Sequence, residues 1–239
     1  MLEVAELYSG YGNLQILNGV SMQAAPGEIT VIVGPNGSGK STLLKTIAGL
    51  TTIIRGTIAL DGRILSGFPP HKIARSGIAY LPQTESVFTN LSVVENLRMA
   101  GYTVNPNDYD TRVKEALEIF PGLSAYFKTK TANLSGGERQ MVAMTMALIR
   151  KPTVIMFDEP TANLAPKIAT QVLSTIVSLG KTTGMTILLV EQNSKRALEI
   201  GDAAYLLVNG EVAFKGTAKE LLEHKELGRL YLGLRTSES

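Results

Sequence analysis

Three glycines, a lysine and a serine follow one another at close spacing in GPNGSGKST, residues 34–42. The segment matches G-x-x-x-x-G-K-[ST] from Gly34 to Ser41. Glycines at this spacing allow a loop whose backbone N–H groups point inward and bind an anion at the start of a helix. Lys40 can then reach the β- and γ-phosphates of a nucleotide, and the Ser41 hydroxyl can ligate Mg²⁺. The nucleotide-binding residues predicted in this phosphate loop are Gly34, Pro35, Asn36, Gly37, Ser38, Gly39, Lys40, Ser41 and Thr42.

The flanks of the phosphate loop decide between this interpretation and a plain glycine-rich turn with a solvated lysine. The run EITVIVG before the loop is typical of a buried strand, and KSTLLKTIAGL after it is typical of a helix. A strand before and a helix after are the context that a phosphate-binding loop requires. The flanks therefore favour a phosphate site.

Two acidic residues end the apolar run VIMFDEP, residues 154–160. A buried strand that stops at Asp158 and Glu159 brings both carboxylates to the C-terminal edge of a sheet, where α/β folds bind ligands. Asp158 is suited to hold Mg²⁺ through its water shell, and Glu159 to orient or polarise an attacking water. The alternative is that the two acids only cap a following helix, and the phosphate loop upstream favours the catalytic interpretation.

The segment LSGGE, residues 134–138, opens a predicted helix with two glycines. Ser135 and Glu138 have the spacing of a capping box, so a capped helix alone is one interpretation. Gly136 and Gly137 would weaken the first turn of such a helix. They are explained if the backbone N–H groups at this point must come close to a phosphate.

Alternation of strands and helices predicts an α/β fold with a mainly parallel sheet around a P-loop NTPase core. The runs LEVAELY and ILNGVSMQA, with the Asp-Gly turn of IALDGRIL, predict an N-terminal antiparallel β subdomain. A second hairpin turn is predicted at Asn209 and Gly210. A capping box at Ser92 and Glu95 and a stop before Pro121 mark inserted helices. We expect one domain over 1–239, with an inserted helical subdomain over approximately 84–150.

Composition excludes several classes of protein. The 239 residues are 44% hydrophobic and 18% charged, which indicates a folded globular chain. A net charge of +2 does not favour nucleic-acid binding. No run approaches the roughly 18 apolar residues that span a bilayer, and no secretory signal is apparent. The absence of cysteine fits a reducing cytoplasm.

The order of these motifs resembles the ATP-binding subunit of ABC transporters over nearly the whole chain. That resemblance implies ATP and Mg²⁺ as cofactors, stacking of Tyr11 on adenine, and a place for Gln83 in the Mg²⁺ shell beside Ser41 and Asp158. It also implies that LSGGE faces the γ-phosphate held by a second subunit, so that ATP lies between two cassettes. The residues of this signature segment are Leu134, Ser135, Gly136, Gly137 and Glu138.

Two positions depart from the family pattern. Ala165 stands where an aspartate is expected, and Gln192 stands where a histidine is expected after a strand. The resemblance places Gln192 at the γ-phosphate, where an amide can still donate a hydrogen bond but carries no charge. The alternative is that Gln192 caps the following helix SKRALEI. His71 and His224 are expected to be ordinary surface residues.

The stretches LAP, LLVEQN and YLGL are similar to the smaller ATP-binding subunit of importers of branched-chain amino acids. This resemblance implies an ATPase at the cytoplasmic face of the membrane, paired with a related cassette and with transmembrane permease subunits. A substrate-binding protein would be met only indirectly. The alternatives are a soluble ABC-type ATPase of DNA or translation machinery, or a regulatory subunit with low turnover.

Overall fold

Six strands form the central sheet, in the order β10-β9-β3-β8-β7-β6. The computed structural model describes residues 1–84 and 86–232, so residue 85 and residues 233–239 of the predicted domain ranges lie outside it. All neighbouring strands of this sheet are parallel except β9 and β10, which confirms the expected α/β class. The strands are β3 (Ile29–Val33), β6 (Ile78–Leu81), β7 (Val154–Asp158), β8 (Thr186–Val190), β9 (Ala203–Val208) and β10 (Glu211–Thr217).

Three of the four inner strands, β3, β7 and β8, are buried at every position. Strands covered on both faces read as continuous apolar runs, which is the pattern of these three segments. Their register aligns Val190 of β8 with Ile32 of β3 on one side and with Asp158 of β7 on the other. The carboxyl ends of all three strands therefore lie at one edge of the sheet.

A second, antiparallel sheet has the order β2-β1-β4-β5. Its strands are β1 (Leu2–Tyr11), β2 (Leu14–Ala24), β4 (Thr52–Leu60) and β5 (Arg63–Ile64). Asp61 and Gly62 between β4 and β5 have φ values of 50° and 77°, and Asn209 and Gly210 between β9 and β10 have 50° and 79°. Two positive φ values in succession are those of a type I′ turn, so both predicted hairpin turns are confirmed.

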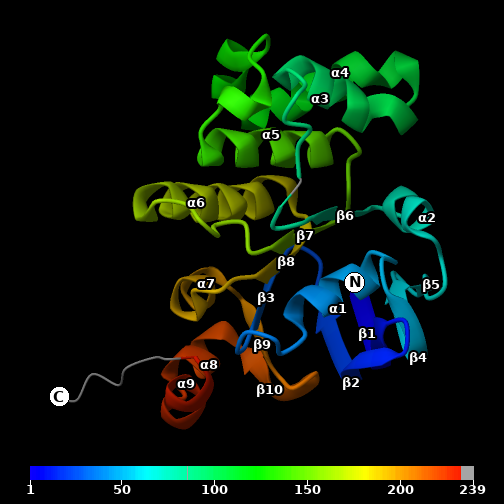
Figure 1. Cartoon of the computed structure of the whole chain (residues 1–239), viewed down its shortest axis with the longest axis vertical. Coiled ribbons are helices and arrows are strands. Elements are labelled where there is room, and N and C mark those ends of the chain that lie inside the picture. The colour runs from blue at the N-terminus through cyan, green and yellow to red at the C-terminus, as the bar shows by residue number, and fades with distance from the viewer. Residues whose placement is uncertain (85, 233–239) are drawn as a thin grey trace.

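Helix α1 (Lys40–Ile47) lies between the two sheets (Figure 1). Its apolar residues pack in one cluster with residues from both sheets. The cluster includes Leu43, Leu44 and Ile47 of α1, Val4 and Ile58 of the antiparallel sheet, and Met156 and Leu188 of the central sheet. Packing on both sides fixes the N-terminus of α1 at the carboxyl edge of β3.

The other face of the central sheet carries α6 (Pro166–Thr183) and α5 (Gly136–Leu148), which pack in a second apolar cluster. Strand β7 serves both clusters, because Ile155 and Phe157 belong to this one and Met156 belongs to the cluster under α1. Further helices are α2 (Pro70–Arg75), α7 (Ser194–Ile200), α8 (Ala218–Glu223) and α9 (Lys225–Tyr231). Across residues 1–84 and 86–232, none of the helices has the length and apolar character to cross a membrane.

Helices α3 (Val93–Ala100), α4 (Pro106–Ile119) and α5 gather at one end of the molecule, beyond α6 (Figure 1). Both predicted capping boxes are present, at Ser92 and Glu95 before α3 and at Ser135 and Glu138 before α5. Helix α4 ends at Ile119, before the predicted stop. Three 3₁₀ turns complete this group, at Gly101–Thr103, Pro121–Tyr126 and Thr131–Asn133.

A buried carboxylate connects the loop after β7 to the end of β8. Glu191 is 2% exposed, and its Oε1 accepts hydrogen bonds from the backbone N–H of Thr161 at 3.1 Å and from its hydroxyl at 2.8 Å. Burial raises the pKa of Glu191 above its usual value, the Thr161 bonds oppose this rise, and the Glu159 carboxylate adds to it. The two hydrogen bonds from Thr161 to Glu191 fix the position of the chain two residues after Glu159.

The raised pKa of Glu191 predicts a pH-dependent cost to folding. Below the ordinary pKa of 4.5 the Glu191 carboxyl is protonated in both the folded and the unfolded chain, so its ionisation does not lower the free energy of unfolding. Above 4.5 the unfolded chain releases this proton first, so the contribution of Glu191 to the free energy of unfolding falls until the folded group has ionised. In Glu191→Gln, the amide oxygen can accept both Thr161 bonds without ionising. We expect the stability of this variant relative to native to increase from pH 4.5 towards neutrality in urea unfolding.

Glu211→Gln, at an exposed position of β10, serves as the control for this experiment. Its stability relative to native should stay level over the same pH range. A level difference for Glu191→Gln as well would contradict the raised pKa.

Candidate functional site

The phosphate loop connects the end of β3 to the start of α1 and depends on its glycines. Gly34, Gly37 and Gly39 have φ values of 150°, 79° and 102°, a region that favours glycine. A Cβ on Gly34 would also lie 2.0 Å from the Leu207 carbonyl oxygen of β9. Gly39 is the N-cap of α1 and has no side chain between the helix N-terminus and the pocket. The loop therefore presents backbone N–H groups where an anion is favoured.

Lys40 begins α1 and turns its ammonium back over the phosphate loop. Its Nζ donates to the carbonyl oxygens of Gly34 at 2.9 Å and Pro35 at 3.0 Å, and the residue is only 5% exposed. Burial lowers the pKa of Lys40, whereas the carboxylates of Glu159 and Asp158 raise it. The positive charge is thus held inside the loop and beside the two acids that end β7.

Asp158 is 3% exposed at the end of β7 and accepts one hydroxyl hydrogen bond on each carboxylate oxygen. The Ser41 hydroxyl donates to Oδ1 at 2.8 Å. The Tyr80 hydroxyl donates to Oδ2 at 2.9 Å. Ser41 and Asp158, 117 residues apart, are therefore in direct contact. The sequence predicted both as Mg²⁺ ligands but did not predict this hydrogen bond.

Glu159 leaves the sheet through a backbone conformation that is rare for glutamate. Its φ is 50°, and its N–H donates to the Val190 carbonyl of β8 at 2.9 Å. Departures of this kind cost of order 1–3 kcal/mol and cluster at functional sites. The side chain turns towards Gln83, whose Nε2 donates to its Oε2 at 2.9 Å. Gln83 follows β6, so residues from two strand ends hold this carboxylate in place.

Lys40, Ser41, Gln83 and Glu159 line one pocket of about 520 Å³, and Asp158 lies next to it through its hydrogen bond with Ser41. Gln192 lines it from the end of β8, and Ile16 contributes an apolar wall from β2. Ile16, Tyr80 and Glu191 carry no local sequence signal for the site, because the groups they meet there are distant in sequence. The pocket residues are Ile16, Asn36, Gly37, Gly39, Lys40, Ser41, Thr42, Gln83, Glu159 and Gln192.

Gln192 does not cap the helix that follows it. The N-cap of α7 is Asn193, whose side chain accepts from the Arg196 backbone N–H at 3.2 Å. The interpretation of Gln192 as a helix cap is therefore wrong. Its exposed side chain is left to face the pocket beside Lys40 and Glu159.

The signature segment and Tyr11 do not line this pocket. Tyr11 ends β1 with 44% of its surface exposed. In the signature segment, a Cβ on Gly136 would lie 2.4 Å from Leu164 Cδ2, and one on Gly137 would lie 2.7 Å from Ile168 Cγ2. Close packing near the start of α6 therefore gives these two glycines a structural reason in addition to the phosphate contact expected from the sequence.

The donor set beside Lys40 fits Mg²⁺. This ion prefers hard oxygen ligands and binds through one or two protein groups together with phosphate and water. The Ser41 hydroxyl and the Asp158 carboxylate are adjacent oxygen donors at the mouth of the phosphate loop. The amide of Gln83 lies on the same pocket.

Comparison with known proteins agrees with this geometry. Residues 17–162 match the family model described as ABC transporter. The chain is 53% identical over 234 residues to the probable branched-chain amino acid transport ATP-binding protein LivF of Archaeoglobus fulgidus, over 98% of this chain and 99% of the relative. It is 39% identical to the high-affinity branched-chain amino acid transport ATP-binding protein BraG of Pseudomonas aeruginosa, over 98% and 100%.

Solved structures show the same architecture. An ATP-binding cassette of an ABC transporter in its ADP conformation matches with a TM-score of 0.85 and 27% identity, over 96% of this chain and 97% of that one. A nucleotide-free ATP-binding cassette from an ABC transporter matches with a TM-score of 0.82 and 28% identity, over 92% of both chains. The chain therefore belongs to the ABC transporter family, as one of its ATP-hydrolysing cassettes.

Proposed function

We propose that this chain hydrolyses MgATP in the pocket at the carboxyl edge of β3, β7 and β8, and thereby energises an importer of branched-chain amino acids. The observation that carries the proposal is the convergence of Lys40, Asp158 and Glu159 on one site from two separate strand–loop units. The amino-acid class is supported by the names of the relatives that are 53% and 39% identical.

Neither alternative function gains support. The relatives named above are transport subunits, and none of them is a DNA-repair or translation ATPase. A regulatory subunit with low turnover was suggested by Ala165 and Gln192. Glu159 is nevertheless present and held by Gln83, as expected of a working hydrolytic site.

The residues divide the work of hydrolysis among themselves. The N–H groups of the phosphate loop and the Lys40 ammonium hold the β- and γ-phosphates. Ser41, Asp158 and Gln83 would hold Mg²⁺, which would neutralise negative charge on the phosphate oxygens. Glu159 accepts a hydrogen bond from the attacking water and turns the water oxygen towards the γ-phosphorus. Tyr11 stacks on the adenine.

Gln192 supplies a hydrogen bond to the γ-phosphate in this account. Its amide N–H₂ donates to a phosphate oxygen, and its carbonyl oxygen can accept from the attacking water. Because the side chain is neutral, this contact lacks the charge that a protonated histidine would bring.

Substitution of Lys40 and of Glu159 should separate binding from chemistry. Lys40→Ala removes the charge paired with the phosphates, and we expect nucleotide affinity to fall about tenfold or more. Glu159→Gln should bind ATP like native and hydrolyse it about a hundredfold more slowly or worse. The measurements are calorimetric affinity and phosphate release, with Lys181→Ala on the exposed last turn of α6 as a control. A Glu159→Gln protein with native turnover would refute the role of Glu159.

Substitution of Gln192 tests its contact with the γ-phosphate. Loss of one donor aimed at transition-state charge costs about a hundredfold in rate, which we expect for Gln192→Ala. Gln192→His should be active or faster. The assay needs the assembled transporter with the hydrolytic site of the partner cassette disabled, so that this site alone is counted.

Asn193→Ala is the matched control, because it removes the α7 cap at a cost of about 1 kcal/mol without touching the pocket. Only stability should change in this variant. A Gln192→Ala protein that hydrolyses ATP like native would leave Gln192 without a catalytic role.

A second cassette completes the site in this proposal. The signature segment lies away from the pocket of its own chain, which is the arrangement expected if it meets the γ-phosphate of another subunit. Ser135 and the N–H groups of Gly136 and Gly137 begin α5, a helix N-terminus that favours an anion. We propose a related but non-identical cassette as the partner, and the group of helices α3, α4 and α5 as a subdomain over approximately 84–150.

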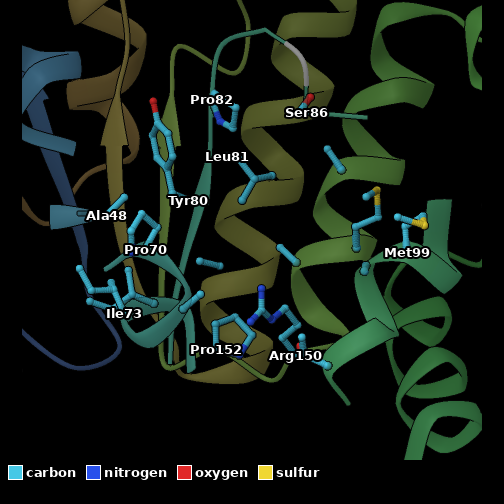
Figure 2. A pocket seen from close by; sticks show the side chains of 18 of the residues that line it. Ala48, Pro70, Ile73, Tyr80, Leu81, Pro82, Ser86, Met99, Arg150 and Pro152 are labelled. Carbon is cyan, nitrogen blue, oxygen red and sulfur yellow. The ribbon is translucent and has the colours of Figure 1, made fainter. Parts of the chain in front are cut away.

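An apolar groove of about 470 Å³ is proposed to receive a cytoplasmic segment of the permease (Figure 2). Met99 of α3 and Tyr102 just after it are 49% and 87% exposed and line the groove, and Ala48 lies on the side opposite Met99 (Figure 2). Arg150 gives one end of the groove a positive charge, and burial and the nearby Arg75 lower its pKa. The fitting segment is therefore apolar with a carboxylate facing Arg150.

Docking there would hold the chain at the cytoplasmic face of the membrane as a peripheral subunit. A substrate-binding protein would then be met only through the permease.

A carboxylate placed in this groove should prevent docking. Met99→Glu puts a charge against the proposed apolar segment, so we expect loss of co-purification with the permease subunits while ATP affinity stays native. Ile54→Glu, at a position of β4 that is 53% exposed, should leave the complex intact. Equal recovery of the permease with both variants would show that the groove is not the docking site.

A further inference from the structure

Tyr80 touches the metal-binding carboxylate without belonging to any of the nucleotide motifs. It lies on β6, an edge strand of the central sheet, in register with Met156 of β7. Its hydroxyl reaches past the end of the register to Asp158, 78 residues away in sequence, and donates to Oδ2 at 2.9 Å. Tyr80 precedes Gln83 by three residues, so the strand that leads to Gln83 also supports Asp158.

Two donors on two oxygens restrict the Asp158 side chain to one orientation. The Ser41 hydroxyl is on Oδ1 and the Tyr80 hydroxyl is on Oδ2. With Asp158 only 3% exposed, water has little access to replace a lost donor. Hydrogen bonds to a charged group are the stronger ones, and a carboxylate oxygen left without its partner in a buried site is unfavourable.

The Tyr80 hydroxyl is a permanent donor rather than a titrating group. Burial raises the pKa of Tyr80 far above its usual value, and the Asp158 carboxylate raises it further. The ring is also held in place, because it packs against the apolar cluster around α1. The hydroxyl is therefore protonated and aimed at Asp158 throughout the physiological range.

We propose that Tyr80 is a positioning residue for the Mg²⁺ site, whose hydroxyl holds Asp158 in the orientation that presents Oδ1 beside Ser41. The proposal rests on the proposed function, because it requires MgATP to bind beside these residues. Partners that orient a ligating carboxylate set metal affinity, and their loss typically costs about 10- to 100-fold.

The Tyr80 ring also lies in the wall of the apolar groove. Figure 2 shows the ring beside Leu81 and Pro82, with the hydroxyl directed away from the end of the groove that holds Arg150. One side chain therefore contacts both the proposed docking surface and the carboxylate of the metal site.

Metal-dependent nucleotide binding by the Tyr80→Phe protein tests the positioning role. This variant keeps the ring and its packing and loses only the donor. The Kd for ATP is measured calorimetrically in EDTA and then over a series of Mg²⁺ concentrations. We expect a native Kd in EDTA, because the phosphate loop is unchanged, and a Mg²⁺ requirement raised about tenfold or more. Tyr80→Met, a second variant without a hydroxyl, should give the same shift.

Tyr205→Phe is the matched control. Tyr205 is 3% exposed on β9, belongs to the same apolar cluster, and uses its hydroxyl to accept from Gln23 N and donate to Gln23 O. Loss of this hydroxyl should change the free energy of unfolding, but the Mg²⁺ concentration needed for ATP binding should stay at the native value. An unchanged or lowered requirement in Tyr80→Phe would overturn the proposal.

Asp158→Asn distinguishes failure of this inference from failure of the proposed function. If ATP binding by the native chain responds to Mg²⁺ and Asp158→Asn weakens that response while Tyr80→Phe does not, Tyr80 has no positioning role. If Asp158→Asn leaves the response native, the metal site itself has been assigned to the wrong residues, and the inference falls with it.

Discussion

The alignment of three strand ends is the constraint on which the site depends. The register of β3, β8 and β7 brings Ile32, Val190 and Asp158 into line, so the chain leaves all three strands at the same edge. The phosphate loop, the Glu159 turn and Gln192 are the next segments along the chain. Glu159 N–H donates to the Val190 carbonyl of β8, and the Ser38 carbonyl of the phosphate loop accepts from Gly210 N–H in the turn between β9 and β10. A slip of one residue in any of these strands would turn Asp158 or its neighbours to the other face of the sheet.

Local chemistry explains why much of this arrangement was predictable from sequence. Capping boxes, Asn-Gly and Asp-Gly turns and buried strands are specified by residues a few positions apart, and the structure has each where it was expected. The phosphate loop is likewise a local pattern, set by glycines with positive φ. The placement of Asp158 and Glu159 at the ligand-binding edge followed from the rule that α/β folds bind ligands at the carboxyl ends of their strands. The α/β class and the family assignment rest on these same features.

Contacts set by register between distant segments were not predictable. The hydrogen bond from Tyr80 to Asp158 depends on which strand lies beside β7 and on how the two are aligned. In the sequence, Glu191 is only a polar residue after a strand. The fold shows that its carboxylate accepts two hydrogen bonds from Thr161. The packing of Gly136 against Leu164 is of the same kind. The YLGL stretch extends beyond the described residues, and Ala165 is an N-cap of α6 without a side-chain hydrogen bond.

A crystal structure of the Glu159→Gln chain with ATP and Mg²⁺ tests the central claim most directly. The account predicts the β- and γ-phosphates against the phosphate loop and Lys40, and Mg²⁺ among oxygens that include Ser41. It also predicts Asp158 in the metal shell, directly or through water, with the Tyr80 hydroxyl still on its other oxygen. A nucleotide bound elsewhere, or a metal ion away from Ser41 and Asp158, would contradict it.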